Sequence, residues 1–318
     1  EITQILRDVY KIESGPIVTN RPFKNDRYFV RADLQINDQH RLEATYQRLE
    51  ESTVRPDDQA TTGTFANTIV GLNTFYKSGT VSDYYSGRLY SQWTDNFSTE
   101  LRYSRSEVQD LQDPVGGGEA QSDNPIPRII VGIDNPGTTP DGAVEVGPGF
   151  SRSANDLRTT VDQYRAVAKV DLGSHKLKFG FEWNHANLFN LFVQNATGTL
   201  NFRSIADLRA GLLSPGTGSA VNTTNSPANV VSGAVEGAFG NFSSTGDIND
   251  AAAAFKRELY SIYGQDEWEI SDQLNAVIGV RADWYDGGAP KHNPQFFRRY
   301  GITNAIGFSR LPPVIMPR

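Results

Sequence analysis

Apolar and polar side chains alternate residue by residue in four long stretches of the chain, at about 28–50, 81–108, 162–185 and 258–285. A period of two indicates β-strands, because successive side chains of a strand point to opposite faces. A short polar segment interrupts the alternation in each stretch, at Asn37–His40, Thr94–Phe97, Gly173–His175 and Ser271–Gln273. The pattern therefore predicts four antiparallel hairpins, which together contain about eight strands.

The predicted strands are long, and one face of each is strongly charged. Their runs reach the ~9–11 residues that a tilted strand needs to cross a membrane, whereas ordinary strands average about 5–6 residues. A basic side chain facing hydrocarbon at mid-membrane would cost roughly 2–4 kcal/mol. We therefore expect the charged face to line a wet interior and to carry Lys178, Glu182, Arg281 and Asp283. The opposite, apolar face includes Phe179, Phe181, Ile278 and Val280.

Aromatic side chains gather near the ends of the predicted strands. Tyrosine and tryptophan prefer the two membrane–water interfaces, although aromatic residues also favour β-strands of any kind. Taken together with strand length, their placement favours an interfacial girdle over ordinary β-propensity. The aromatic residues concerned are Tyr28, Tyr46, Tyr85, Trp93, Tyr103, Trp183, Trp268 and Trp284. Asp266 is an exception to the pattern, because it falls on the apolar face of the fourth hairpin.

Three long connections join the hairpins, at roughly 51–80, 109–161 and 186–257, and they are rich in Gly, Pro, Asn and Ser. Connections longer than ~12–15 residues are uncommon in compact domains and are usually functional or disordered. Outer-membrane barrels place short turns in the periplasm and long loops outside the cell. We therefore expect the three long connections to be extracellular.

The same assignment places both terminal segments, 1–27 and 286–318, on the extracellular side. A complete single-chain barrel is expected to begin and end in the periplasm. Although eight strands can close a small barrel, the pattern therefore predicts an internal part of a larger one. The predicted fold class is all-β: residues 1–318 form a segment of an antiparallel, up-and-down transmembrane β-barrel with long extracellular loops.

Composition argues against several classes of protein. The chain of 318 residues has no cysteine, a net charge of −7 and a mean hydropathy of −0.46, and no run approaches the ~18 apolar residues of a membrane helix. Low hydropathy does not exclude a membrane barrel, because only every second side chain of a strand faces lipid. The negative net charge argues against a nucleic-acid partner.

The four histidines are scattered over the predicted fold. His40 and His175 lie near the short turns, whereas His185 and His292 lie at or beyond the far ends of strands. A zinc site or a nucleophile–base pair needs its members to converge. We therefore interpret these histidines as solvated residues with no catalytic or metal-binding role.

Other motifs match known sites only in part. Gly116–Gly118 is not followed by the Lys-Ser/Thr pair of a phosphate-binding loop. Asp247–Asp250 carries oxygen ligands but lacks the mid-loop glycine of a calcium loop, and it is interpreted as a helix N-cap before Ala251–Ala254. Glu267 and Glu269 share a strand face that lumen-facing polarity explains without catalysis. The sequence thus predicts no enzyme, no metal site and no cofactor, and it identifies no ligand-binding residue.

The fourth hairpin contains three recognisable motifs, Tyr263–Trp268, Ile270–Asp272 and Gly279–Asp283. They resemble the barrel repeat of TonB-dependent outer-membrane receptors. Further stretches are similar to the Oar-like subgroup of these receptors, namely Asn25–Arg31 with Asn37–Asp38, His175–Glu182, Phe189–Val193, Ser204–Leu208 and Asn293–Phe296. The match spans most of the chain, and the order and spacing of the motifs make it more specific than any single motif.

The resemblance implies a barrel of about 22 strands that is filled by an N-terminal plug. Subgroup members often carry a further N-terminal domain like the regulatory domain of carboxypeptidases. Such receptors take up scarce extracellular ligands with energy passed by TonB. On this resemblance the plug and the TonB-contacting segment are expected outside this sequence. The implied partners are outer-membrane lipid, the TonB complex through that plug, and an extracellular ligand that the sequence does not identify.

Two other functions fit parts of the pattern. A passive porin or a structural, adhesin-type barrel would share the strands but would have no upstream plug, and a porin would conduct ions without TonB. A soluble, secreted β-rich protein, such as a carbohydrate-binding sandwich or a hydrolase, would extract without detergent. The strand length and the charged face favour the receptor and localise the chain to the bacterial outer membrane.

Overall fold

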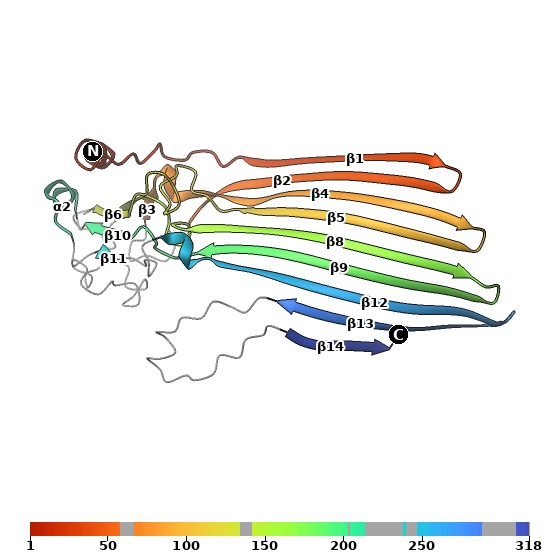
Figure 1. Cartoon of the computed structure of the whole chain (residues 1–318). Helices are drawn as coiled ribbons and strands as arrows, with labels where there is room; N and C mark the ends of the chain where they lie inside the picture. Colours follow the sequence, from red (N-terminus) through yellow and green to blue (C-terminus); the bar gives the residue numbers. More distant parts are fainter. Residues whose placement is uncertain are drawn as a thin grey trace, which may run out of the picture.

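Two β-sheets and a few short helices make up the computed structural model of the chain (Figure 1). One sheet contains nine strands, most of them long, and the other contains five short ones. The tight turns of the long sheet lie at one end of the molecule, and the short elements lie at the other (Figure 1). The structure describes residues 1–57, 67–133, 142–202, 204–213, 238–239, 247–287 and 310–317.

The long sheet contains the four predicted hairpins. They are β1 (Phe23–Asn37) with β2 (His40–Pro56), β4 (Phe75–Thr94) with β5 (Phe97–Leu111), β8 (Asn155–Asp171) with β9 (His175–Phe192), and β12 (Ala253–Ser271) with β13 (Leu274–Gly287). A shorter strand, β14 (Arg310–Pro317), pairs with β13. The order is β1-β2-β4-β5-β8-β9-β12-β13-β14, and every neighbouring pair is antiparallel.

The predicted fold class is confirmed: the protein is all-β, and its long sheet is a meander of antiparallel strands. Each of the eight strands in the hairpins has 14 to 20 residues. This length exceeds the ~9–11 residues of a membrane crossing. In the described part of the chain β1 and β14 do not pair with each other, so the sheet is open.

The strands continue beyond the predicted hairpins on the side of the long connections. Residues 51–56 of β2 pair in unbroken register with residues 75–80 of β4. Polar residues are common on both faces of these segments, so no apolar–polar alternation marks them as strands. Backbone hydrogen bonds join β2 to β4 there, and these bonds do not depend on which side chains the strands carry.

The pattern also did not predict β14, which lies within the terminal segment 286–318. Its last residue, Pro317, pairs with Val280 in the middle of β13, so this strand runs back along the sheet. Two prolines at 312 and 313 disfavour a strand in a sequence-based reading, because proline cannot donate a ladder hydrogen bond.

A second, folded layer occupies the ranges that the pattern predicts as loops, together with the first residues of the chain. Its strands are β3 (Asn67–Val70), β6 (Arg128–Ile133), β7 (Gly142–Val146), β10 (Thr199–Phe202) and β11 (Ala238–Phe239). Its helices are α1 (Ile2–Asp8) and α2 (Ile205–Ala210). We call these seven elements the loop subdomain. Its sheet, in the order β11-β10-β6-β7-β3, mixes parallel and antiparallel pairs.

The loop subdomain contains the main hydrophobic core of the described residues. Helix α1 contributes Leu6, helix α2 contributes Leu208, and β6 contributes Ile129 and Val131, all of them 0–1% exposed. Many large apolar residues of the long sheet are instead exposed. No helix in the described part of the chain is long and apolar enough to cross a membrane.

Candidate functional site

One outward-pointing aromatic side chain stands on each of eight neighbouring strands, from β1 to β13. Their rings form a band in which six are in two contiguous groups. Centroids are 5.1 Å apart for Tyr46 and Tyr85 in one group and 4.8 Å apart for Tyr164 and Trp183 in the other, which also includes Tyr103 and Tyr260. We call this band the aromatic girdle. Its members are Tyr28, Tyr46, Tyr85, Tyr103, Tyr164, Trp183, Tyr260 and Trp284. Such a girdle is typical of the membrane–water interface of outer-membrane barrels.

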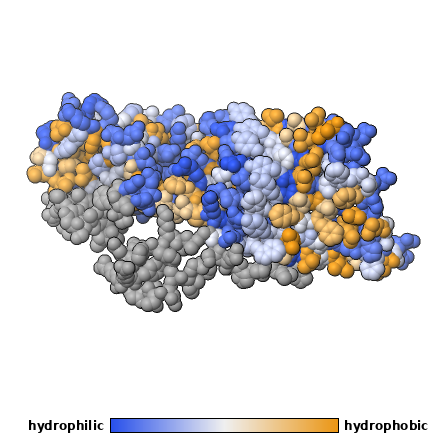
Figure 2. All heavy atoms as spheres, in the orientation of Figure 1, coloured by the Kyte–Doolittle hydropathy of each residue, from blue (hydrophilic) through white to orange (hydrophobic). Residues whose placement is uncertain are grey.

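An apolar belt covers the same face between the aromatic girdle and the tight turns. Phe179 and Ile278 are 52% and 61% exposed, and further apolar side chains on neighbouring strands are similarly open. Figure 2 shows apolar side chains gathered toward the turn end and a hydrophilic zone nearer the middle of the molecule. Soluble monomers rarely expose a large contiguous apolar surface, so this belt is the surface that faces lipid.

Tyrosine hydroxyls of the girdle are bound by carboxylates on its loop side. Tyr46 donates a hydrogen bond to Asp83 across the β2–β4 pair at 2.7 Å, and Arg48 binds the second oxygen of Asp83 at 2.8 Å. A tyrosine at an interface needs a partner for its hydroxyl while its ring contacts lipid. The ion pair supplies that partner and marks the start of the aqueous side.

The same arrangement occurs once more, and a variant of it occurs once, in which the tyrosine and the carboxylate lie on one strand and a histidine of the neighbouring strand replaces the arginine. Each copy joins two strands whose connection is one of the long ones, namely β5 with β8 and β9 with β12. The members are Tyr103, Asp162 and Arg105 in one case, and Tyr260, Glu258 and His185 in the other. We call the three arrangements the interfacial triads.

A hydroxyl deletion tests the contribution of one triad. In the full-length protein, Tyr103→Phe should lower the free energy of unfolding by about 1 kcal/mol, because the hydrogen bond to the Asp162 carboxylate is lost. The urea midpoint in lipid vesicles measures this change. Tyr164→Phe is the matched control, because its ring lies in the same girdle and its hydroxyl has no hydrogen-bond partner in the described part of the chain. If the two variants lowered the urea midpoint equally, the Tyr103 hydroxyl would not contribute to stability through its bond to Asp162.

The concave face of the sheet is polar and charged. The residues that the alternation predicts to face inward lie together on it. Arg281 donates to Glu182 at 3.1 Å and to Asp283 at 2.9 Å, while Lys178 is 5.9 Å from the ring centroid of Tyr263. The register aligns a row of seven charged residues and one serine across eight strands: Asp33, Glu43, Arg88, Arg102, Arg165, Glu182, Ser261 and Asp283.

Positive charge accumulates in the middle of this face. Arg88, Arg102 and Arg165 lie directly opposite one another on β4, β5 and β8, and Lys169 lies opposite Lys178 on β8 and β9. We call these five residues the basic patch. Arg88 and Arg165 have carboxylates at 3.8 and 3.4 Å, whereas the other three have none within 4.0 Å in the described part of the chain.

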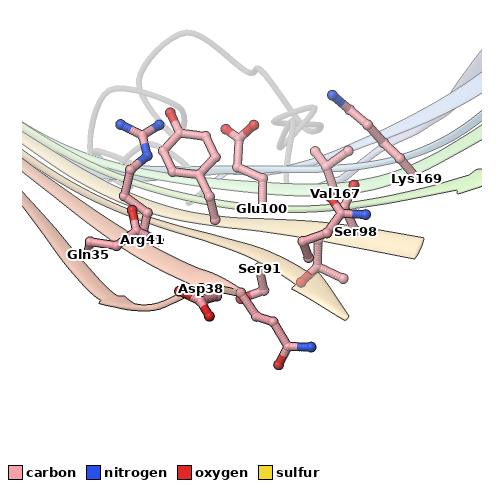
Figure 3. Close-up of a pocket in the computed structure, with 12 residues that line it drawn as sticks. Gln35, Asp38, Arg41, Ser91, Ser98, Glu100, Val167 and Lys169 are labelled. Atoms are coloured by element: carbon pink, nitrogen blue, oxygen red, sulfur yellow. The ribbon is translucent and has the colours of Figure 1, made fainter. Parts of the chain in front are cut away.

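A shallow cavity of ≈ 320 Å³ adjoins the basic patch toward the turns. Figure 3 shows Arg41, Glu100 and Lys169 projecting to the same side of the sheet, inside its curve. The guanidinium of Arg41 lies 4.4 Å from the ring centroid of Tyr90. The cavity is open and lined by both charges, so it is part of the wall and does not enclose a small molecule.

The three histidines that the structure describes do not converge on one site. His40 packs against Trp93, with ring centroids 5.0 Å apart, and His185 belongs to an interfacial triad. His175 binds Asp266 at 2.8 Å, which explains how this carboxylate is accommodated on the apolar face. These three have partners and remain partly exposed, and His292 lies outside the described residues. Over the described ranges, no group of three or more His, Cys, Asp or Glu residues could hold a metal.

The remaining motifs have structural roles. Residues 116–118 form a turn in which Gly117 and Gly118 have positive φ. Asp247 accepts a hydrogen bond from Asn249 and is the N-cap of a 3-10 helix at Ile248–Ala251, in place of the α-helix that the motif predicts. Glu269 binds Lys176 at 3.1 Å.

The loop subdomain contains a further cavity of ≈ 620 Å³, next to the 3-10 helix. Its polar lining residues are Gln121, Thr197 and Asn249, together with one charged residue, Asp247. The Gln121 Oε1 and Thr197 Oγ1 atoms are buried and have no hydrogen-bond partner among the described residues. The cavity could therefore receive a ligand that offers hydrogen bonds.

Two carboxylates close to this region are partly buried. Desolvation raises the pKa of Asp113, with a further contribution from the negative charge of Asp156. Desolvation also raises the pKa of Glu119, which directly precedes the cavity-lining Ala120. Both groups are more easily protonated than ordinary surface carboxylates, and both lie beyond the end of β5, outside the membrane.

A buried ion pair holds the loop subdomain together, and sequence reasoning missed it. Arg128 of β6 binds Glu145 of β7 through two hydrogen bonds of 2.8 and 3.4 Å, and both side chains are at most 3% exposed. The guanidinium lies 5.9 Å from the ring centroid of Phe150. Nothing in the sequence singles out these two charges, because their pairing depends on the β6–β7 register.

Comparison with known proteins agrees with this architecture. The chain matches the family described as outer membrane beta barrel domain over residues 13–298. No curated protein matches its sequence.

Similar solved structures include Pseudomonas aeruginosa FpvA bound to a heterologous pyoverdine (10% identity, TM-score 0.50), the outer membrane transporter YddB of Escherichia coli (13%, 0.47) and its ferric-catecholate import receptor Fiu (14%, 0.41). They cover 95%, 85% and 92% of this chain, which itself covers 34%, 28% and 39% of theirs. This chain thus spans about a third of their length, and at these identities the FpvA match shows the fold alone. The chain belongs to the outer membrane β-barrel domain family and is a protein of the bacterial outer membrane.

Proposed function

We propose that the chain forms part of the wall and mouth of a TonB-dependent receptor of the Oar-like subgroup, which binds an extracellular ligand and moves it across the outer membrane. One observation carries this proposal: the segments between the membrane strands form a loop subdomain with its own core and buried ion pair. Recognition sites commonly lie on loops that a rigid scaffold positions. A passive pore needs no such folded layer at its mouth.

The cavity beside Gln121 and Thr197 is the proposed contact point for ligand. Its two unpartnered oxygen atoms favour a ligand that donates hydrogen bonds. FpvA, which shares this fold, is bound to a pyoverdine in its structure, in keeping with capture of an extracellular small molecule. The ligand of this chain is left undefined.

The free edges of the sheet support a larger barrel. An unpaired backbone group in the hydrocarbon core costs several kcal/mol, so open sheet edges do not occur there. The edge of β1 that does not face β2 has no partner strand in the described part of the chain. We propose that further strands of the same protein continue the sheet and close the barrel.

Two measurements on the purified full-length protein test the receptor assignment. It should bind the purified periplasmic domain of TonB in a calorimetric titration, and it should leave a planar lipid bilayer closed to ions. A porin would conduct and would not bind TonB. A protein that remains in buffer after membranes are pelleted, without detergent, would contradict the membrane assignment itself.

A further inference from the structure

The cavity of ≈ 620 Å³ beside the 3-10 helix has walls that the fold holds in place. Three of its apolar lining residues, Ala120, Ala196 and Ile248, also pack in a small hydrophobic cluster. The backbone N–H groups of Ala120 and Ala196 both donate to Ser153, the first to its carbonyl oxygen at 2.7 Å and the second to its Oγ at 2.8 Å. Cavities of about this size accept small organic molecules. The cavity is therefore formed before any ligand binds.

Several hydrogen-bond donors around this cavity are already used. The Nε2 atom of Gln121 donates to the carbonyl oxygen of Asn155 at 3.2 Å. The side-chain and backbone N–H groups of Asn249 donate to Asp247 Oδ1 at 3.1 and 2.9 Å. The backbone N–H of Ile126 has an acceptor at 2.9 Å, and the two lining prolines have no N–H. These groups are therefore not available to donate to a ligand.

Two hydrogen-bond acceptors of the cavity, in contrast, lack a donor. Gln121 Oε1 and Thr197 Oγ1 are buried and have no hydrogen-bond partner among the described residues. The bond to Asn155 fixes the orientation of the Gln121 amide, because a carbonyl oxygen can only accept. The hydroxyl oxygen of Thr197 can accept as well as donate. Buried polar atoms normally have a partner, and a ligand with several N–H groups would supply one to both.

The charge around the cavity is negative. Among the described residues that line it, none is arginine, lysine or histidine, and the Asp247 carboxylate is the only charged group. Glu119 directly precedes the lining residue Ala120, and its Oε2 atom is buried without a hydrogen-bond partner in the described part of the chain. Desolvation raises the pKa of Glu119, and the negative charge of Asp113 raises it further. These carboxylates attract a cation and repel an anion.

We propose that this cavity binds the primary ammonium group of a small organic cation with an apolar body. Gln121 Oε1 and Thr197 Oγ1 accept two of the ammonium hydrogens, and the exposed Asp247 carboxylate supplies the opposite charge. Ile126 and Ile248 contact the apolar body. An ammonium group suits this wall because it has three donors and no acceptor. The inference rests on the proposed function, which places ligand contact at this cavity, and it adds the chemical class of the ligand.

Three matched probes test the ligand class on the full-length protein in lipid nanodiscs. L-leucinamide carries an ammonium group, N-acetyl-L-leucinamide is neutral, and N-acetyl-L-leucine is an anion. Saturation-transfer NMR titrations measure their dissociation constants at about pH 6.5, where an α-amino group is protonated. L-leucinamide should bind about tenfold more tightly than the neutral probe, because it adds a charge-assisted hydrogen bond, and the anion should bind most weakly.

Substitutions of similar shape locate the binding site. Thr197→Val removes an acceptor and should weaken L-leucinamide binding about tenfold. Asp247→Asn keeps an oxygen for the Asn249 N–H groups but removes the charge, so it should weaken L-leucinamide binding about threefold and leave binding of N-acetyl-L-leucinamide unchanged. Thr53→Val, on β2 and outside the cavity, is the matched control for Thr197→Val and should bind L-leucinamide like the unaltered protein.

The outcomes separate the ligand class from the receptor assignment. Equal affinities for the three probes, a preference for the anion, or no saturable binding of L-leucinamide would each show that the proposal is wrong. Equal affinity of Thr197→Val and Thr53→Val for L-leucinamide would place its site elsewhere and would also refute the proposal. A protein that binds the periplasmic domain of TonB but not L-leucinamide refutes only the ligand class, whereas one that binds L-leucinamide, conducts ions and does not bind TonB refutes the receptor.

Discussion

Arg128→Met in the full-length protein should destabilise the loop subdomain by about 3–5 kcal/mol, because it leaves the Glu145 carboxylate buried without its cation. The two side chains are at most 3% exposed, so water cannot replace the lost partner. Hydrogen exchange of the β6 and β7 amides measures the local free energy of opening. Exchange in the membrane part of β8 and β9 should not change, since the ion pair lies outside the long sheet.

The matched control removes both charges at once. Arg128→Met with Glu145→Leu should recover much of the lost stability, because replacing a buried ion pair by apolar residues of similar volume is often neutral or stabilising. Arg209→Ala, which breaks an exposed pair with Glu1, should cost less than about 1 kcal/mol. If the double variant is as unstable as the single one, packing rather than charge compensation explains the loss.

The membrane strands could be predicted from the sequence because their environment imposes a local rule. Lipid on one face and a wet lumen on the other enforce a period of two, so Phe179 and Lys178 reveal their faces without knowledge of any partner strand. The exception in the fourth hairpin, Asp266, depends on a neighbour: His175 reaches it from β9. The histidine and the carboxylate are 91 residues apart, and only the register brings them together.

The loop subdomain could not be predicted in the same way. Its strands are short, and two of its pairings are parallel, between segments far apart in sequence. The apolar run Ile129–Val131 was an available signal for a buried strand, since a short continuous apolar run is typical of one. The sequence on both sides of this run is rich in glycine and proline and favours an irregular loop, so the run alone did not predict a strand.

The basic patch could be predicted from the sequence only in part. The alternation indicates that Arg102, Lys169 and Lys178 face the interior, but it does not show which strands place their cations opposite one another. That information is in the stagger between strands, which turn geometry and pairing determine. The charge row across the sheet is therefore a property of the tertiary structure, although each of its members could be assigned to a face from the sequence.

Moving a single positive charge to the apolar belt should have the second largest effect. Phe179→Lys places an ammonium group on the outward face of β9, in the belt between Trp183 and the turn, where the native side chain is 52% exposed. A lysine at the bilayer midplane costs about 2–4 kcal/mol. The urea midpoint of the folded protein in lipid vesicles should fall accordingly.

Asn184→Lys, on the concave face of the same strand, is the control and should change stability by less than about 1 kcal/mol, because its ammonium group stays hydrated in the lumen. Equal losses in the two variants would mean that the two faces of β9 meet the same environment, which is incompatible with a barrel wall that separates lipid from a polar interior.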